Sequence, residues 1–295
     1  MIDLHCHMLP GIDDGAPDLA TSLAMAKAFV ADGVTVVACT PHILPAVYPN
    51  TGPDIQARVD ALQVHLNEAG VALQLVAGAD NHIVPNMVAG LRSGHLLTLA
   101  GSRYVLVEPP HHVAPPRLEE FFFDLVVAGF VPILTHPERL SWIKSHYPTI
   151  QRLAQSGTWM QITAGSLLGG FGKSPQYWAE RMLDEGIVHI LATDSHNTQH
   201  RPPNLSAGRR QAEKRVGPVE SENLVVKRPY GIIHSEVASQ LWPPPRVAGR
   251  VESESENAHG RSTAGPPKSA DAADDRLGGR RTGGIAERLR RIFGQ

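Results

Sequence analysis

The stretch MIDLHCHMLPGIDDG (Met1–Gly15) opens the chain and decides how the rest is interpreted. Ile2–His5 has the apolar character of a short strand. Because side chains alternate along a strand, the H-x-H spacing places His5 and His7 on one side and Cys6 on the other. Two imidazoles on one face at the end of a strand are typical of a metal site.

The same kind of strand recurs along the first two thirds of the chain and alternates with helix-like segments. The expected strands are Ile2–His5, Val34–Cys39, Ala72–Ala77, Tyr104–Val107, Val131–Leu134, Thr158–Ile162 and Val188–Ala192. The expected helices are Leu19–Ala31, Asp54–Glu68, Leu118–Ala128, Ile150–Gln155 and Pro175–Glu185. Strands that alternate with helices favour parallel pairing, and seven such units suit a closed barrel better than an open sheet. The fold class is therefore α/β.

Polar side chains follow nearly every expected strand, which is where a βα barrel carries its active site. The nine candidate metal ligands are His5, His7, Asp14, His42, Asp80, Glu108, His136, Asp194 and His196. The pair Asp194 and His196 repeats the spacing of the first two histidines. Asp13 fits a turn better than a ligand position, although the DDG sequence leaves it hard to separate from Asp14.

Imidazole and carboxylate ligands without thiolate suit manganese, iron or zinc, and two ions about 3.5–4 Å apart can clamp a phosphoryl group. Three further histidines, His82, His111 and His112, lie close enough in sequence to line the mouth of the barrel. Arg139 and Arg201 also follow strands, and guanidinium groups bind phosphate oxygens in pairs. We expect these two arginines to be catalytic.

Other classes of protein are disfavoured. The net charge of −2 gives no basic surface for nucleic acid, and no apolar run is long enough to span a membrane. The sequence lacks a GxGxxG motif, and GGFGKS (Gly169–Ser174) has Leu167 where a P-loop needs glycine. Two cysteines and no signal peptide suit the cytoplasm. A cysteine-based phosphatase needs arginine six residues after its cysteine, where this chain has Ile12 and Pro45.

The composition changes after Trp242. Residues 1–242 are expected to form the catalytic domain, and residues 243–295 a disordered tail with almost no large apolar side chains. The last residues regain a pattern, with an apolar face flanked by arginines over residues 285–293. This pattern predicts a short basic amphipathic helix that contacts an anionic membrane or a partner. A frayed end, or a helix docked on the chain's own barrel, is the alternative.

Taken in order, the motifs resemble the polymerase-and-histidinol-phosphatase (PHP) superfamily. More narrowly, they resemble its manganese-dependent protein-tyrosine phosphatases of bacterial capsule and exopolysaccharide biosynthesis. The matching pieces are MIDLHCHMLPGIDDG (Met1–Gly15), TPH (Thr40–His42), GAD (Gly78–Asp80), SRYVLVE (Ser102–Glu108), THPER (Thr135–Arg139) and ATDSHNTQHRPP (Ala192–Pro203). The resemblance runs from Met1 to about Ile233, and the tail lies outside it.

The resemblance implies a distorted, TIM-like (β/α)7 barrel with a site for two or three Mn²⁺ ions, for which Fe, Zn or Co are substitutes. The first ion would take His5, His7, Asp80 and Asp194; the second Asp80, Glu108 and His136; the third Asp14, His42 and His196. The family usually has Glu at the position of Asp80, which puts the bridging geometry in question. The implied substrate is the phosphotyrosine tail of a bacterial tyrosine kinase.

Three alternatives share the same site. One is a small-molecule phosphatase of the histidinol-phosphatase kind, another a phosphodiesterase or nuclease, and the third a metal-binding regulator with weak turnover. A tyrosinate leaving group has a parent pKa of about 10 and needs no strong general acid. The sequence leaves the physiological metal and the oligomeric state open.

Overall fold

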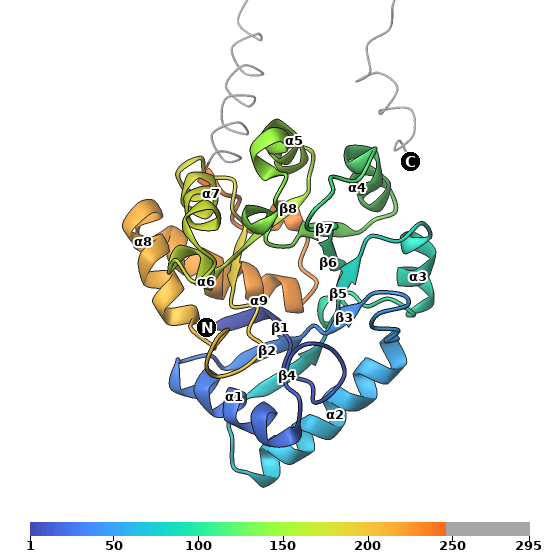
Figure 1. Ribbon diagram of the computed structural model, residues 1–295, viewed down its shortest axis with the longest axis vertical. Helices are drawn as coiled ribbons and strands as arrows, with labels where there is room; N and C mark the ends of the chain where they lie inside the picture. Colours follow the sequence, from blue (N-terminus) through green and yellow to red (C-terminus); the bar gives the residue numbers. More distant parts are fainter. Residues whose placement is uncertain (246–295) are drawn as a thin grey trace, which may run out of the picture. The chain divides into compact units, whose positions relative to one another are not determined.

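Strands and helices alternate along the computed structural model, which describes residues 1–245 (Figure 1). Its strands are β1 (Ile2–Cys6), β2 (Val36–Cys39), β3 (His42–Ile43), β4 (Gln74–Ala77), β5 (Asp80–His82), β6 (Tyr104–Glu108), β7 (Val131–Leu134), β8 (Trp159–Thr163) and β9 (Ile190–Ala192). Its α-helices are α1 (Leu19–Ala31), α2 (Gly52–Glu68), α3 (Met87–Ser93), α4 (Leu118–Val127), α5 (Ile143–Gln155), α6 (Ala164–Leu167), α7 (Lys173–Asp184), α8 (Leu205–Glu222) and α9 (Arg228–Ile233). Shorter helical turns are η1 (Leu99–Gly101), η2 (Pro137–Arg139), η3 (Asn223–Lys227) and η4 (Ala238–Gln240).

The strands are all parallel and follow the order of the chain. One sheet has the order β1-β2-β4 and the other β3-β5-β6-β7-β8-β9. Beyond β9 the chain returns to β1, where Cys6 and Ser195 form an isolated parallel bridge and His7 N donates to Ser195 O at 2.9 Å. The two sheets together therefore form a curled parallel arrangement of strands. The expected α/β fold with parallel pairing is confirmed.

The second and third expected strands are present as β2 and β4, and each is followed by a short strand, β3 or β5, that was not expected. Pro41 separates β2 from β3 and has no N–H to donate to the ladder. Gly78 stands beside this break, and a Cβ there would lie 3.1 Å from Thr40 Cγ2. Pairing resumes between His42 and Asp80 in β3 and β5. Asp80, expected just past the end of a strand, instead begins one, in register with His42.

An apolar cluster draws side chains from six strands and fills the space that the sheet encloses. Its strand residues include Ile2, Leu4, Ala38, Tyr104, Leu106, Ile133, Trp159 and Ile190. Helices pack outside: α1 and α2 lie on the side of β1, β2 and β4, and α4, α5 and α7 surround β6–β8 (Figure 1). Among the described residues, no helix is both long and apolar enough to cross a bilayer.

The expected helices are present, with differences at their ends. Asp18 caps α1 through Thr21 N at 2.8 Å. α5 begins at Ile143 rather than Ile150, because Pro148 and a kink at His146 hide its first turns in the sequence. α8 was not expected, since Gly217 and Pro218 interrupt its periodicity. The tail from residue 246 on, including the expected helix at 285–293, lies outside the described residues.

Candidate metal centre

The carboxyl ends of the strands bring the nine predicted ligands together. Their donor atoms form five overlapping sets, in each of which all donors lie within 4.8 Å of one another. The sets are His7–Asp14–His42–His196, His5–His7–Asp80, His5–His136–Asp194, His42–His82–Glu108 and Glu108–His111–His136. Every predicted ligand belongs to at least one set, and two of the three histidines predicted to line the mouth, His82 and His111, join them.

Asp13 orients the first histidines. Its Oδ2 lies 2.7 Å from His7 Nδ1 and accepts from His42 N at 3.1 Å, while its Oδ1 accepts from Gly15 N at 2.9 Å. Burial opposes the charge on Asp13, but His7 outweighs it and lowers the pKa of the carboxyl. A carboxylate behind a ligating imidazole fixes the ring and its tautomer. Asp13 therefore does more than the turn role that the sequence indicates.

Gly15 closes this loop against the same histidine. A Cβ at residue 15 would lie 2.0 Å from His7 O, so no larger residue fits without moving the ligand.

Asp80 shows most directly that the cluster fits cations. The residue is fully buried, and neither carboxylate oxygen has a hydrogen-bond partner. Its Oδ2 lies 3.5 Å from His5 Nε2 and 3.6 Å from His42 Nδ1, separations beyond a good hydrogen bond. A buried charge without hydrogen bonds is costly unless it is paired or coordinates a metal. The donors present therefore fit a divalent ion.

Glu108 lies at the centre of four imidazoles. Its Oε2 lies 2.6 Å from His82 Nε2 and 3.3 Å from His42 Nδ1. Its Oε1 lies 3.0 Å from His111 Nε2 and 3.6 Å from His136 Nε2. Burial raises the pKa of Glu108, but the imidazoles outweigh it and hold the pKa well below its ordinary value.

Asp194 links the imidazoles to the two predicted catalytic arginines. Its Oδ1 lies 3.3 Å from His7 Nε2 and 3.5 Å from His5 Nε2. Its Oδ2 accepts hydrogen bonds from both Arg139 and Arg201. Burial opposes its charge, but His5 and Arg201 outweigh that effect and hold the pKa of Asp194 well below its ordinary value.

Two of these residues have strained backbones. The φ angles of His136 and Asp194 are +32° and +51°, in the region that non-glycine residues rarely adopt. β9 ends at Ala192, so Asp194 and His196 lie in the segment that follows it, on either side of Ser195, which pairs with Cys6. Such strain concentrates at functional sites, where surrounding contacts hold it.

The histidines differ in their affinity for protons. Burial lowers the pKa of His5, yet Asp194 and Asp80 outweigh it and raise the pKa to about 9. Burial lowers the pKa of His42 too, and Glu108 and Asp80 raise it to about 9. Burial and the neighbouring His7 lower the pKa of His196 to about 4. Protons therefore balance part of the carboxylate charge in the absence of cations.

Both cysteines lie outside this chemistry. Cys6 and Cys39 are fully buried, and burial raises the pKa of each thiol. Cys6 Sγ contacts Ser195 O at 3.6 Å, behind the candidate ligands. Neither thiol is exposed or acidic enough to serve as a nucleophile.

Glu138, which the sequence argument passed over, anchors the next loop. Its Oε1 accepts from Thr163 N and from Ser166 Oγ, both at 2.8 Å. Burial raises the pKa of this carboxyl. THPER therefore supplies a candidate ligand, a loop anchor and an arginine within four residues. Glu138 stands within the THPER motif, but only the fold shows which residues it contacts.

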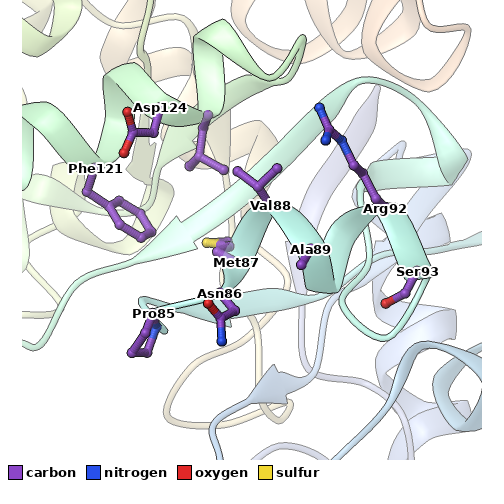
Figure 2. A pocket seen from close by; sticks show the side chains of 10 residues that line it. Pro85, Asn86, Met87, Val88, Ala89, Arg92, Ser93, Phe121 and Asp124 are labelled. Atoms are coloured by element: carbon purple, nitrogen blue, oxygen red, sulfur yellow. The ribbon is translucent and has the colours of Figure 1, made fainter.

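A hollow between α3 and α4 lies apart from the cluster. It has a volume of about 620 Å³, and none of the candidate ligands lines it. Figure 2 shows Met87 and Val88 of α3 facing Phe121 of α4, with Arg92 and Asp124 on opposite sides. With few polar groups that converge, it offers less for phosphoester chemistry than the ends of the strands.

Known proteins resemble this chain over most of its length. Residues 1–234 match the family described as capsular polysaccharide synthesis, CpsB/CapC. The tyrosine-protein phosphatase YwqE of Bacillus subtilis is 35% identical over 201 residues, which cover 68% of this chain and 79% of YwqE. The tyrosine-protein phosphatase CpsB of Streptococcus pneumoniae is 25% identical over 244 residues, covering 80% of this chain and all of CpsB.

A solved structure agrees with these sequence matches. It comes from crystal structures of YwqE from B. subtilis and CpsB from S. pneumoniae, described as metal-dependent tyrosine phosphatases. It aligns with a TM-score of 0.78 and 31% identity, over 83% of this chain and 98% of the other.

Proposed function

The chain belongs to the CpsB/CapC family of capsular polysaccharide synthesis proteins, and from this premise we propose that it is a metal-dependent protein-tyrosine phosphatase. The observation that carries the proposal is the buried carboxylate of Asp80, which makes no hydrogen bond, within an imidazole cluster that two arginines border. That arrangement combines sites for cations with donors for a phosphoryl group.

The proposed metal is manganese, held at two or three positions. His5, His7, Asp80 and Asp194 would hold the first ion, Asp80, Glu108 and His136 the second, and Asp14, His42 and His196 the third. His82 and His111 add imidazoles beside Glu108. When bound, the cations supply Lewis-acid activation of water and neutralise charge on the phosphoryl group.

The protein's own groups would orient the phosphoryl group. Arg139 and Arg201 converge on Asp194 Oδ2, at the edge of the cluster, and in the proposed reaction they bind the equatorial oxygens. Asp13 keeps His7 turned toward the cluster through its 2.7 Å contact. A tyrosinate leaves without strong acid assistance because its parent pKa is about 10. The described residues therefore supply the groups that this reaction needs.

The fold would serve this chemistry as a distorted (β/α)7 barrel. Support comes from the chain-order pairing of the strands and from the bridge between Cys6 and Ser195. The proposed substrate is the phosphotyrosine tail of a bacterial tyrosine kinase that acts in capsule or exopolysaccharide synthesis. We place the enzyme in the cytoplasm, with residues 285–293 as a proposed membrane contact.

Hydrolysis of three substrates tests the proposal: a phosphotyrosine peptide, histidinol phosphate and a dinucleotide, each with and without chelator. We expect the peptide to be the best substrate, chelation to abolish the activity and Mn²⁺ to restore it best. A control variant replaces Asp124, which is exposed on α4, with Asn and should hydrolyse the peptide at the wild-type rate. Faster hydrolysis of histidinol phosphate or of the dinucleotide would contradict the assignment.

A further inference from the structure

The ring of Phe171 lies against both of the arginines that border the cluster. The guanidinium carbon of Arg139 is 4.3 Å from the ring centroid, and that of Arg201 is 5.8 Å from it. Both distances fall within the range of cation–π attraction. One aromatic ring therefore lies within cation–π range of both cationic groups that are proposed to bind phosphate.

The loop that carries Phe171 is built to hold the ring in place. A Cβ at Gly165 would lie 3.0 Å from Phe171 Cε2, so the ring uses the space that this glycine leaves open. Gly170 N donates to Gly165 O at 2.9 Å and closes the turn. The start of this loop is tied to Glu138, next to Arg139, through Thr163 N and Ser166 Oγ. Ring and arginine are thus anchored to the same short segment.

Packing in the apolar core does not explain the position of Phe171. The ring is only partly buried, and it belongs to neither of the apolar clusters that form the core of the described residues. Three glycines flank it, at residues 169, 170 and 172. A large aromatic side chain in a glycine-rich loop leaves apolar surface exposed to water, which is unfavourable. Its contact with the guanidinium groups accounts for its position.

An aromatic face is also well suited to this purpose. It attracts a cation but accepts no strong hydrogen bond, so the N–H groups that do not bind Asp194 or His196 stay available for phosphate. A second carboxylate, in addition to Asp194, would occupy the remaining donors and neutralise more of their charge. Arg201 still has a free donor, because its buried Nε has no protein partner. The residue also lines a cavity of about 60 Å³, together with Thr193 and Asn204.

We propose that Phe171 is a positioning residue whose ring holds Arg139 and Arg201 facing the cluster, ready to bind the oxygens of a phosphoryl group. The inference rests on the proposed phosphatase function. Its effect on catalysis passes through the arginines, because the ring itself offers no polar atom to the reaction. An aliphatic side chain of similar bulk should fill the space without holding the arginines.

Substitution of Phe171 tests this role in the manganese-loaded full-length protein. Phe171→Leu should weaken binding of inorganic phosphate, measured by calorimetry, about tenfold, and should lower kcat/KM on a phosphotyrosine peptide by a similar factor. Metal content should stay unchanged. Phe171→Trp, which keeps an aromatic face, should recover most of the loss. Phe123→Leu, at a 59% exposed position on α4, is the matched control and should behave as wild type.

A double-mutant cycle separates positioning from simple packing. In an Arg139→Ala, Arg201→Ala background, Phe171→Leu should cause little further loss of phosphate binding, since the groups it orients are gone. A full tenfold loss in that background, wild-type behaviour of Phe171→Leu, or no recovery with Trp would each overturn the inference. If wild type binds phosphate but does not hydrolyse the peptide, the proposed function fails, while the calorimetry still decides the role of Phe171.

Discussion

Replacing Asp80 with Asn removes one buried charge and keeps the shape of the side chain. Neither of its oxygens makes a hydrogen bond, and Oδ2 lies 3.5 Å from His5 Nε2 and 3.6 Å from His42 Nδ1, so without a cation only these two long ion pairs stabilise the carboxylate. Residues that only support a metal ligand change metal affinity about 10–100-fold. For a carboxylate inside the cluster we expect a loss of about 100-fold.

This loss converts into a measurable change in stability. At a metal concentration of about 100 times Kd, binding adds about 2.7 kcal/mol, and a 100-fold weaker site adds only about 0.4 kcal/mol. For a protein of this size the difference lowers Tm by about 5–9 °C. Differential scanning fluorimetry with a manganese titration measures it, and peptide hydrolysis should be abolished in parallel.

The metal-free protein gives the decisive comparison. In the presence of chelator, Asp80→Asn removes only the two long ion pairs with His5 and His42, so the drop in Tm should be smaller than the drop with Mn²⁺. Asp80→Glu, which keeps the carboxylate, should keep metal binding. An equal drop in Tm with and without metal would show that Asp80 is structural, and the reasoning would be wrong.

Four further outcomes are expected. Iodoacetamide should leave the rate of the native enzyme unchanged, because Cys6 and Cys39 are fully buried; inactivation with metal content intact would refute the metal-dependent mechanism. Arg139→Lys should weaken phosphate binding about tenfold by calorimetry, since an ammonium cannot bind two oxygens in parallel. Burial, with Arg228 nearby, holds the pKa of His189 well below its ordinary 6.5, so the unfolded chain binds the extra proton. In chelator, the free energy of unfolding should therefore fall as pH drops below about 6.5, by up to about 1.4 kcal/mol per pH unit from this residue. In His189→Gln, the free energy of unfolding measured in urea should depend less steeply on pH. Deleting Pro243–Gln295 should leave peptide hydrolysis unchanged but reduce co-sedimentation with anionic liposomes; equal sedimentation of both forms would remove the membrane contact.

The expected strands follow from the sequence because each is a short apolar run before a polar residue. The short strands β3 and β5 were harder to foresee. β3 follows Pro41, and its pairing with β5 depends on contacts between residues distant in sequence. Pro148 hid the start of α5, because a proline in a helical pattern usually marks its end.

The nine candidate ligands were foreseeable because they lie at or just past the ends of the strands expected from the sequence. The supporting residues were not, because their roles come from contacts distant in sequence. Asp13 reaches the backbone of His42, and Glu138 reaches Thr163 and Ser166. Such contacts depend on packing, which a single sequence leaves open.

If Asp194 holds a cation as proposed, its two oxygens would make cation and anion binding cooperative. One faces the imidazoles and the other binds both arginines, so a cation that draws on this carboxylate leaves the guanidinium groups with more positive charge to offer an anion. By thermodynamic reciprocity, an anion on the arginines must strengthen the cation's affinity by the same factor. Phosphate, as product or inhibitor, would then slow the loss of metal instead of promoting it.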